Sequence, residues 1–371
     1  MSLRVGVVGG GLVAQAMHLH YLAARRDQFS LAGLAEPSRT VREALGARYA
    51  IAKLHPEYRS LLDAGGLDAI VVCSPAGTHA EIVLAALESG LHVFVEKPMC
   101  ITLDDADAIV AARDRAGRVV QVGTMKRFDP AYERMLEELP ASASALLYIS
   151  VVVSDPEFEP YFEPGELVRG SDVPREVVEA TRAAEAEQVE AAIGSGAPDV
   201  VRAFSESFLG SLVHDVNLVH GLLERMGEPL PAEVIGGDWW NEGRAVSGSI
   251  RLANGARWDS AWIQLLATHE YREEVSLFFA DSVRSLTFPS PWLKQYPTVY
   301  RRSERDAAAN AVRVAQFYGE SFGRELDHFH RCVTEDEPCR TPPEQARLDI
   351  GVLAQMFLAA RPQEVASHAQ G

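Results

Sequence analysis

The sequence predicts an α/β protein in two parts, a doubly wound parallel sheet followed by a domain with a mostly antiparallel sheet. From residue 1 to about 123, short β-branched runs alternate with longer amphipathic segments, the pattern of repeated βαβ units. From about residue 126 the β-rich runs lengthen and are separated by sharper turns. A chain of 371 residues is long enough for two hydrophobic cores, so we expect domains at 1–125 and 126–371.

The first part is predicted to alternate strands with helices. Its strand runs are almost continuously apolar, as in parallel strands that helices cover on both faces. Gly90 and Gly117 follow two of the helical segments, where a helix C-cap commonly falls. The strands are expected at Arg4–Val8, Leu31–Ala35, Ala69–Cys73, His92–Val95 and Val119–Val122, and the helices near Val13–Ala24, Arg39–Tyr49, Thr78–Ser89 and Leu103–Ala116.

The second part is predicted to be an α+β domain with an open, mostly antiparallel sheet. Asn254-Gly255 between two β-rich runs is a strong hairpin signal. The acidic, alanine-rich segment Pro174–Ile193 is either an exposed surface helix or a lid over a cleft. Strands are expected at Ala145–Val153, Ser247–Leu252, Arg257–Leu265, Glu274–Phe279 and Arg284–Phe288, with helices at Arg175–Ile193, Gly210–Arg225 and Pro342–Ala360, the last packing back on the first domain.

Charge and cysteine content exclude several classes of function. The 35 basic and 52 acidic residues give a net charge of −17, which disfavours nucleic acid and anionic membranes as partners. Four cysteines without a CxxC pair imply neither a disulfide scaffold nor a zinc site, and we expect no bound metal. The three consecutive glycines near the N-terminus argue against a signal peptide, so a cytoplasmic protein is expected.

A glycine-rich turn follows the first predicted strand and opens a helix. The run Gly9-Gly10-Gly11-Leu12-Val13-Ala14 matches the pattern G-x-G-x-x-[GA]. Gly9 permits the tight turn, Gly11 lets the backbone approach a pyrophosphate, and the N–H groups of the helix that begins near Leu12 and Val13 can bind the anion. In this strand–turn–helix context the motif predicts a Rossmann dinucleotide-binding domain.

Glu36 ends the second predicted strand, near the place where an acidic residue binds the adenosine ribose hydroxyls. A carboxylate there repels a 2′-phosphate and favours NAD. Arg39 lies close by and could bind that phosphate, so NADP stays open.

Lys97 lies in the tripeptide Glu96-Lys97-Pro98, directly after the strand His92–Val95. Ligands of open α/β sheets bind at this carboxyl edge. A lysine in such a cleft can hydrogen-bond a substrate oxygen, stabilise it as it becomes anionic, or transfer a proton. The alternative is an ordinary surface lysine.

His214 and Asn217 lie three residues apart on a predicted helix and share one face, whereas Asp215 is rotated about 100° away. A histidine beside a nicotinamide ring is a suitable general base for a hydroxyl proton. A structural histidine is the competing interpretation.

Together these motifs resemble the Gfo/Idh/MocA family of oxidoreductases. The resemblance rests on the glycine turn, Cys73-Ser74-Pro75 with His79 downstream, Glu96-Lys97-Pro98, Lys126-Arg127-Phe128-Asp129-Pro130, and His214-Asp215-Val216-Asn217. It implies that a cofactor site is lined by Gly9, Gly11, Leu12, Val13, Glu36, Ser74, Pro75, His79, Glu96 and Lys97. It also implies that Lys97 and His214 are catalytic and that Lys97, Arg127, His214 and Asn217 bind the substrate.

The sequence departs from this family at Gly210, where many members carry an aspartate that works with the histidine. The stretch from 155 to 205 is also longer than expected of the family. The hypothesis is an NAD(P)-dependent dehydrogenase or reductase that acts on a secondary alcohol of a sugar, cyclitol or related polyol, as a homodimer or homotetramer formed through the second sheet. The alternative is a regulatory protein on the same fold that senses a dinucleotide or sugar without catalysis.

Overall fold

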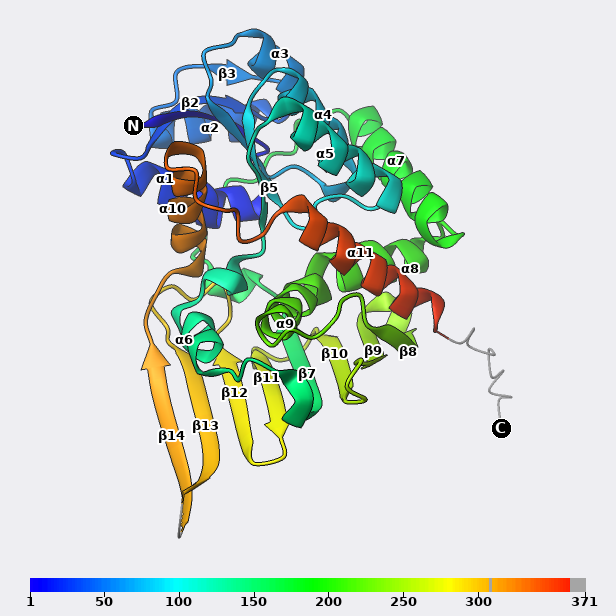
Figure 1. Cartoon of the computed structure of the whole chain (residues 1–371). Coiled ribbons are helices and arrows are strands. Elements are labelled where there is room, and N and C mark those ends of the chain that lie inside the picture. The colour runs from blue at the N-terminus through cyan, green and yellow to red at the C-terminus, as the bar shows by residue number, and fades with distance from the viewer. Residues whose placement is uncertain (307–308, 361–371) are drawn as a thin grey trace, which may run out of the picture.

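A computed structural model describes residues 1–306 and 309–360, so positions 361–371 of the predicted second domain lie outside it. The chain forms a six-stranded parallel sheet and an eight-stranded, mostly antiparallel sheet. In Figure 1 the first sheet and its helices fill the upper half and the second sheet fills the lower half. The predicted fold class is confirmed.

The first sheet has the strand order β3-β2-β1-β4-β5-β6, with every neighbouring pair parallel. Because β2 and β4 lie on opposite sides of β1, the connections diverge there and leave a crevice at the carboxyl ends of these strands. The strands are β1 (Leu3–Val8), β2 (Phe29–Ala35), β3 (Leu54–His55), β4 (Ala69–Val72), β5 (His92–Glu96) and β6 (Val120–Gly123).

The helices around this sheet follow the predicted order. The helices Arg39–Tyr49 and Leu103–Ala116 have the predicted bounds. Each begins after a serine or threonine N-cap and ends at a residue in the αL conformation, which is Gly117 (φ +58°) for the second helix. The helices are a π-helical turn (Ala14–His18) continued by α1 (Leu19–Ala24), then α2 (Arg39–Tyr49), α3 (Tyr58–Asp63), α4 (His79–Glu88) and α5 (Leu103–Ala116).

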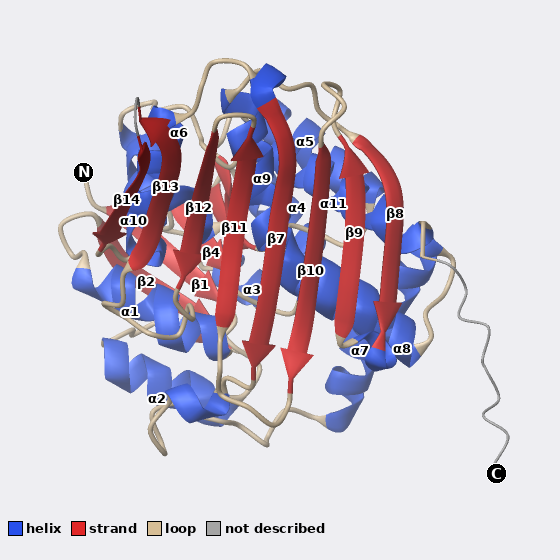
Figure 2. Ribbon diagram, turned by 90° about the horizontal axis from the view of Figure 1, so that it is seen from below, coloured by secondary structure: helices blue, strands red, loops and turns tan. Residues whose placement is uncertain are grey.

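The second sheet has the strand order β14-β13-β12-β11-β7-β10-β9-β8, and only β7 and β10 run parallel (Figure 2). The predicted Asn254-Gly255 hairpin joins β9 to β10, with Gly255 at φ +89°. The strands are β7 (Leu146–Pro156), β8 (Glu233–Trp240), β9 (Ala245–Arg251), β10 (Arg257–Leu265), β11 (Arg272–Phe279), β12 (Ser282–Phe288), β13 (Thr298–Asp306) and β14 (Ala309–Phe317).

Helices cover one face of the second sheet and leave the other open (Figure 2). The helix predicted at 210–225 is preceded by a π-helical segment (Arg202–Leu212) that runs directly into it. The C-terminal helix α11 (Pro343–Leu358) packs on α5 and β6 of the first domain as well as on β8. Within 1–306 and 309–360, no helix is both long and apolar enough to cross a membrane. The helices are α6 (Pro130–Glu138), α7 (Arg175–Ile193), α8 (Pro198–Val201), α9 (Val213–Arg225), α10 (Ser321–Thr334) and α11 (Pro343–Leu358).

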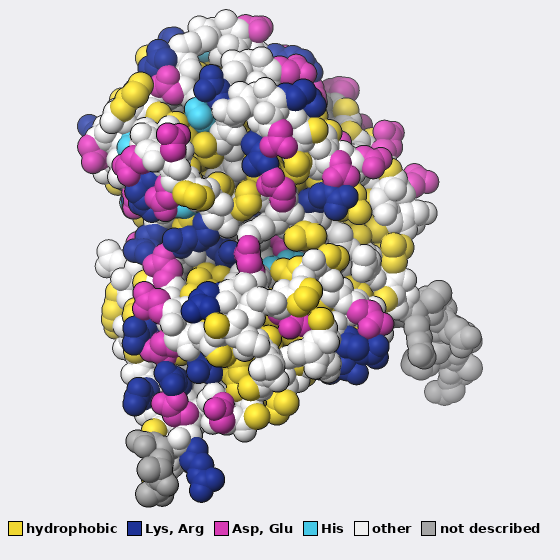
Figure 3. All heavy atoms as spheres, viewed as in Figure 1, with side chains coloured by type: hydrophobic (Ala, Val, Ile, Leu, Met, Phe, Trp, Pro, Cys, Tyr) yellow, Lys and Arg dark blue, Asp and Glu magenta, His cyan; other side chains and the backbone are white. Residues whose placement is uncertain are grey.

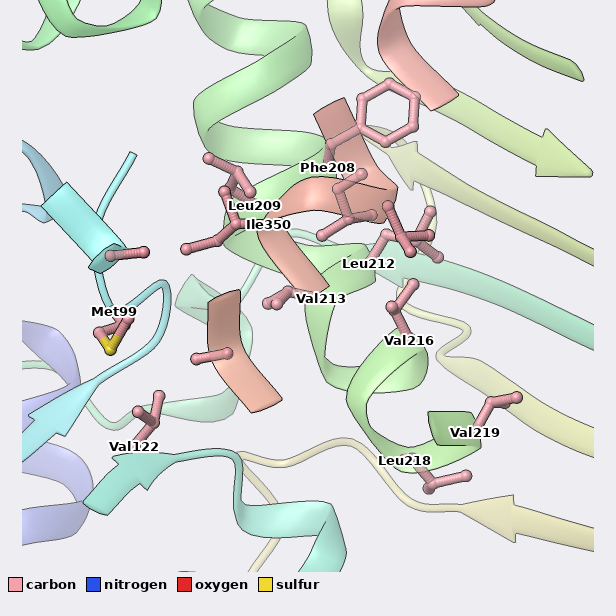
Figure 4. Packing of buried hydrophobic residues seen from close by; sticks show 14 of the residues in the cluster. Met99, Val122, Phe208, Leu209, Leu212, Val213, Val216, Leu218, Val219 and Ile350 are labelled. Atoms are coloured by element: carbon pink, nitrogen blue, oxygen red, sulfur yellow. The ribbon is translucent and has the colours of Figure 1, made fainter. Parts of the chain in front are cut away.

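The predicted boundary between residues 125 and 126 falls within the 3-10 turn Met125–Phe128, which follows the last strand of the first sheet. The hydrophobic core includes residues from both sides of this boundary. One cluster of buried side chains extends from β4 and β5 to the second sheet. Figure 4 shows Leu212, Val213 and Val216 in this cluster, with Met99 and Val122 of the first domain nearby. The division into two domains therefore stays a prediction, whereas the two sheets are joined by shared packing.

Truncation of a side chain in this shared core tests its contribution. Leu212 is fully buried, so Leu212→Ala removes apolar contacts and leaves a cavity, which costs about 2–5 kcal/mol of unfolding free energy. The matched control Leu266→Ala alters a half-exposed side chain and changes stability by no more than about 0.5 kcal/mol. Urea unfolding measures both variants, and equal losses would contradict the assignment.

Candidate functional site

The glycine turn after β1 is shaped to receive a ligand. Gly9 has φ +95°, and a Cβ there would lie 2.6 Å from the Cys73 carbonyl oxygen, so only glycine fits. By contrast, a Cβ built at Gly11 meets no atom of the described residues within 4 Å. Leu12 and Val13 follow at the start of the helix and are half-buried. The turn and this helix N-terminus thus form an open cradle that fits a dinucleotide pyrophosphate.

Glu36 lies directly beside this turn, at the end of β2. Its carboxylate accepts hydrogen bonds from the backbone N–H of Gly10 (2.7 Å) and of Ser38 (2.8 Å). These bonds fix its orientation at the edge where the ribose hydroxyls of a dinucleotide would lie. Arg39 instead pairs with Glu43 on the exposed side of α2 (2.6 Å).

The loop after β4 supplies the opposite wall. His79 is buried, and its ring nitrogens lie 2.7 Å from the backbone oxygens of Ser74 and Pro98. Burial lowers the pKa of His79, and the two hydrogen bonds to the backbone oxygens oppose that shift while the ring links the two loops. His79 therefore supports the wall, whereas Ser74 and Pro75 are less buried and lie on it.

Glu96 anchors the backbone beneath Lys97. One carboxylate oxygen lies 2.5 Å from His18 Nε2, and the other accepts the N–H of Lys97 (3.1 Å). Glu325 brings a second carboxyl to this buried group. Burial and the charge of Glu96 raise the pKa of Glu325 well above its usual range, so the neutral acid accounts for its place there. Glu96 thus orients Lys97 from within the protein.

Lys97 reaches from the first sheet to the second domain. Its Nζ donates a hydrogen bond to the backbone oxygen of Gly210 (2.6 Å), within the π-helical segment. Burial lowers the pKa of Lys97 and the charge of Lys126 lowers it further, whereas Glu96 and Asp155 raise it. At the position where the family resemblance suggests an aspartate, a backbone carbonyl is the partner of the lysine.

His214 lies one turn further along, in α9, and is half-buried. Its Nδ1 has no hydrogen-bond partner among the described residues. Burial, followed by the charges of Lys97 and Lys126, holds the pKa of His214 well below its usual range. The ring is therefore neutral at pH 7 and able to accept a proton.

A buried ion cluster beside His214 was not anticipated from the sequence. Lys126 forms ion pairs with Asp215 (3.2 Å) and with Glu273, and all three side chains are almost fully buried. The Tyr271 hydroxyl donates to Glu273. Lys126 belongs to a motif that the sequence analysis identified, and Asp215 adjoins His214. Glu273 comes from β11, so no local pattern could have indicated the cluster.

Asp155 is a second unanticipated acid, near the end of β7. Burial, followed by the charge of Glu273, raises the pKa of Asp155 to about 6, against the lowering effect of Lys126 and Lys97. Asp155 therefore belongs to the same electrostatic environment as Lys97. A cavity of about 50 Å³ adjoins Lys126 and Glu273, whereas a larger hollow of about 570 Å³ lies elsewhere, between α5, α7 and α11.

The structure places Arg127 and Asn217 in the interior with protein partners, and their contact with substrate stays a prediction. Asn217 is 1% exposed, and its amide donates to Asp349 (2.7 Å). Arg127 is 5% exposed and donates to the backbone oxygen of Asn217 (3.1 Å) and to Gln345 (3.1 Å). Both side chains connect α9 to α11 through these hydrogen bonds. Residues 214 and 217 share one face of α9, but Asn217 on that face lies in the core.

The surface of the molecule carries both signs of charge. Figure 3 shows acidic and basic side chains mixed over one face, with basic ones gathered along the seam between the upper and lower halves. Ion pairs between distant parts of the chain, such as Arg340 with Glu133 (2.6 Å) and Arg25 with Asp327 (2.6 Å), help to hold the molecule together.

The fold and the cradle define a protein with an N-terminal Rossmann dinucleotide-binding domain. Residues 3–124 match the family model described as "Oxidoreductase family, NAD-binding Rossmann fold". Residues 3–124 are thus similar to the NAD-binding Rossmann domain of this oxidoreductase family.

Named relatives are similar to the first part of the chain. An inositol 2-dehydrogenase of Paracoccus denitrificans (strain Pd 1222) is 34% identical over 167 residues, 44% of this chain and 49% of that protein. The scyllo-inositol 2-dehydrogenase (NAD(+)) of Bacillus subtilis (strain 168) is 30% identical over 131 residues, 35% of this chain and 38% of that protein. The matched segments thus span about half of the relatives' length or less.

Solved structures extend the likeness of fold to nearly the whole chain. UDP-N-acetylglucosamine 3-dehydrogenase GnnA from Acidithiobacillus ferrooxidans superposes with a TM-score of 0.71 at 18% identity, covering 97% of this chain and 98% of that one. KijD10, a 3-ketoreductase from Actinomadura kijaniata in complex with NADP and TDP-benzene, gives a TM-score of 0.72 at 16% identity, with the same coverage. At these identities the likeness shows the fold alone.

Replacement of Lys126 tests the buried ion cluster. Lys126→Met leaves Asp215 and Glu273 without a cation in the core, which costs about 3–5 kcal/mol of stability at pH 8. The pKa of Asp215 is already raised well above its usual range, chiefly by burial. A carboxyl group with a raised pKa in the folded state makes that state less stable once the pH is high enough to ionise the group. The stability lost in Lys126→Met therefore grows as the pH rises and is smaller at pH 5.

Chemical unfolding at both pH values measures these losses. The double variant Lys126→Met/Glu273→Gln removes one of the two buried charges and recovers part of the loss. An equal loss at pH 5 and pH 8 would show that the cluster is not charged in the way described.

Proposed function

We propose that this protein is an NAD(P)-dependent oxidoreductase that oxidises a secondary alcohol of a sugar, cyclitol or related polyol to a ketone, or reduces the ketone. The observation that carries the proposal is the hydrogen bond from Lys97, at the carboxyl end of β5, to Gly210, one turn before the neutral His214, in a chain that also has an open glycine cradle. The inositol dehydrogenases that are similar to the first part of the chain support this substrate class.

His214 acts as the general base in the oxidation. The neutral imidazole of His214 accepts the hydroxyl proton as the carbon loses a hydride, so the alcohol becomes a carbonyl compound. Lys97 donates a hydrogen bond to the same substrate oxygen and stabilises negative charge on it. In the reverse direction, protonated His214 returns the proton.

The cofactor is held by the first domain. The Gly9–Gly11 turn and the helix behind it bind the pyrophosphate, and Glu36 accepts the ribose hydroxyls. When bound, the nicotinamide supplies or accepts the hydride at its C4 atom.

The four cysteines are free, which supports a reducing compartment such as the cytoplasm.

Lys97→Ala and His214→Ala test the assignment. Nicotinamide absorbance is followed with NAD or NADP and a panel of inositols, aldoses and sugar acids. Each variant lowers turnover of the active substrate by about 10²- to 10⁴-fold and still binds NADH, because neither side chain is needed to hold the pyrophosphate. Lys53→Ala, a change at an exposed lysine of the same domain, leaves turnover unchanged.

The outcomes separate the alternatives. Turnover of Lys97→Ala at the wild-type rate would show that the lysine has no catalytic role. Binding of NADH by wild-type protein without turnover of any substrate in the panel would favour a sensor of dinucleotide or sugar over an enzyme.

We further propose that the open face of the second sheet packs against a second copy of the chain in a homodimer or homotetramer. Tyr148, Val152 and Phe278 lie on this face, and the Tyr148 and Phe278 rings are 5.7 Å apart. A single apolar sheet face is commonly covered in an assembly. Light scattering after gel filtration gives a mass two or four times 40.5 kDa, and Phe278→Asp lowers it. A monomeric wild-type protein would refute this assembly.

A further inference from the structure

The segment between β7 and α7, residues 157–174, returns from the second domain to the first and lies along the predicted cofactor cradle. The backbone N–H of Val168 donates to Gln15 Oε1 (2.8 Å), and Gln15 Nε2 donates to the Val168 oxygen (3.0 Å). Arg48 at the end of α2 donates to the Glu166 oxygen (3.1 Å). The segment is therefore attached both to the helix that follows the glycine turn and to α2.

Asp172, near the end of this segment, occupies the N-terminus of α2. Its Oδ1 accepts the hydroxyl of Ser38 (2.5 Å) and its Oδ2 accepts the N–H of Thr40 (3.0 Å). These bonds, the one from Ser38 foremost, lower the pKa of Asp172 to about 2. Gly170 passes so close that a Cβ there would overlap Ser38 Oγ. A negative charge is thus fixed at the first turn of α2.

The first turn of α2 is also where a 2′-phosphate would bind. That phosphate would extend from the ribose that Glu36 faces, and the donors available next to it are the Ser38 hydroxyl and the N–H groups of the turn. Asp172 already uses these donors. A dianionic phosphate would meet the charges of Glu36 and Asp172, while Arg39 is paired with Glu43.

We propose that Asp172, supplied by segment 157–174, acts as an internal substitute for the 2′-phosphate and makes the site select NAD over NADP. This inference rests on the proposed function, because it needs a dinucleotide in the cradle. It assigns this segment, which lies within the stretch 155–205, a share in choosing the cofactor.

Binding of NADH and NADPH to the full-length protein tests the proposal without any substrate. Kd values are measured from nicotinamide fluorescence for wild type, Asp172→Ala, Asp172→Asn and the matched control Glu163→Gln, an exposed acid in the same segment. Wild type binds NADH at least about tenfold more tightly than NADPH. Asp172→Ala frees both donors and tightens NADPH binding about tenfold, with NADH changed less than about threefold.

Asp172→Asn removes the charge and keeps the shape, so its preference falls between those of wild type and Asp172→Ala, and Glu163→Gln keeps the wild-type preference. Equal affinities of wild-type protein for NADH and NADPH, or an unchanged preference in Asp172→Ala, would overturn the role of Asp172 while leaving the proposed function intact. If wild-type protein binds neither dinucleotide, the proposed function itself fails. Circular dichroism shows that each variant is folded.

Discussion

The relative position of Lys97 and His214 depends on the hydrophobic core that the two sheets share. Lys97 lies at the end of a strand of the first sheet, and His214 lies on a helix that packs against the second. Met99, two residues beyond Lys97, and Val213, next to His214, are buried in the same cluster. Because closely packed cores resist displacement, this cluster sets the separation of the two groups more firmly than the single Lys97–Gly210 hydrogen bond does.

Charge balance around that core determines which groups are ready to react. Two lysines, Lys97 and Lys126, face three acids brought by the second domain, Asp155, Asp215 and Glu273. The lysines act on His214 in the same direction as burial, so the imidazole is kept neutral. The neutral form of His214 is the one that accepts a proton from a substrate hydroxyl in the proposed oxidation.

The sequence predicted the first domain well because its signals are local. Continuous apolar runs, N-cap residues and the αL residue Gly117 delimit elements within a few residues, and the glycine turn is a contiguous motif. Strands β8, β13 and β14 were missed. β8 contains Gly236 and Gly237, β13 is rich in charged residues, and β14 is an edge strand. Pairing with distant neighbours, rather than local pattern, makes them strands.

The same distinction applies within the site. Lys97 directly follows a strand and His214 lies on a helix, so local sequence patterns were enough to identify both as candidate site residues. Glu273 and Asp155 come from strands far apart in the sequence and meet Lys126 only in the folded chain. His214 and Asn217 were predicted to share one helix face. Local spacing could not show that Asn217, three residues further along, is buried and bonded to Asp349.

Two helix N-termini at the edge of the first sheet differ: one is open, and the other is occupied by a side chain from segment 157–174. The helix after the glycine turn begins beside Gly11, where no side chain intrudes among the described residues. The N-terminus of α2 already holds the carboxylate of Asp172. A Rossmann sheet by itself offers an anion either position, since both helix dipoles point the same way. Asp172 thus leaves one of these two positions open to an anion, and in the proposed selection of NAD the cofactor preference of the first domain depends on a residue outside it.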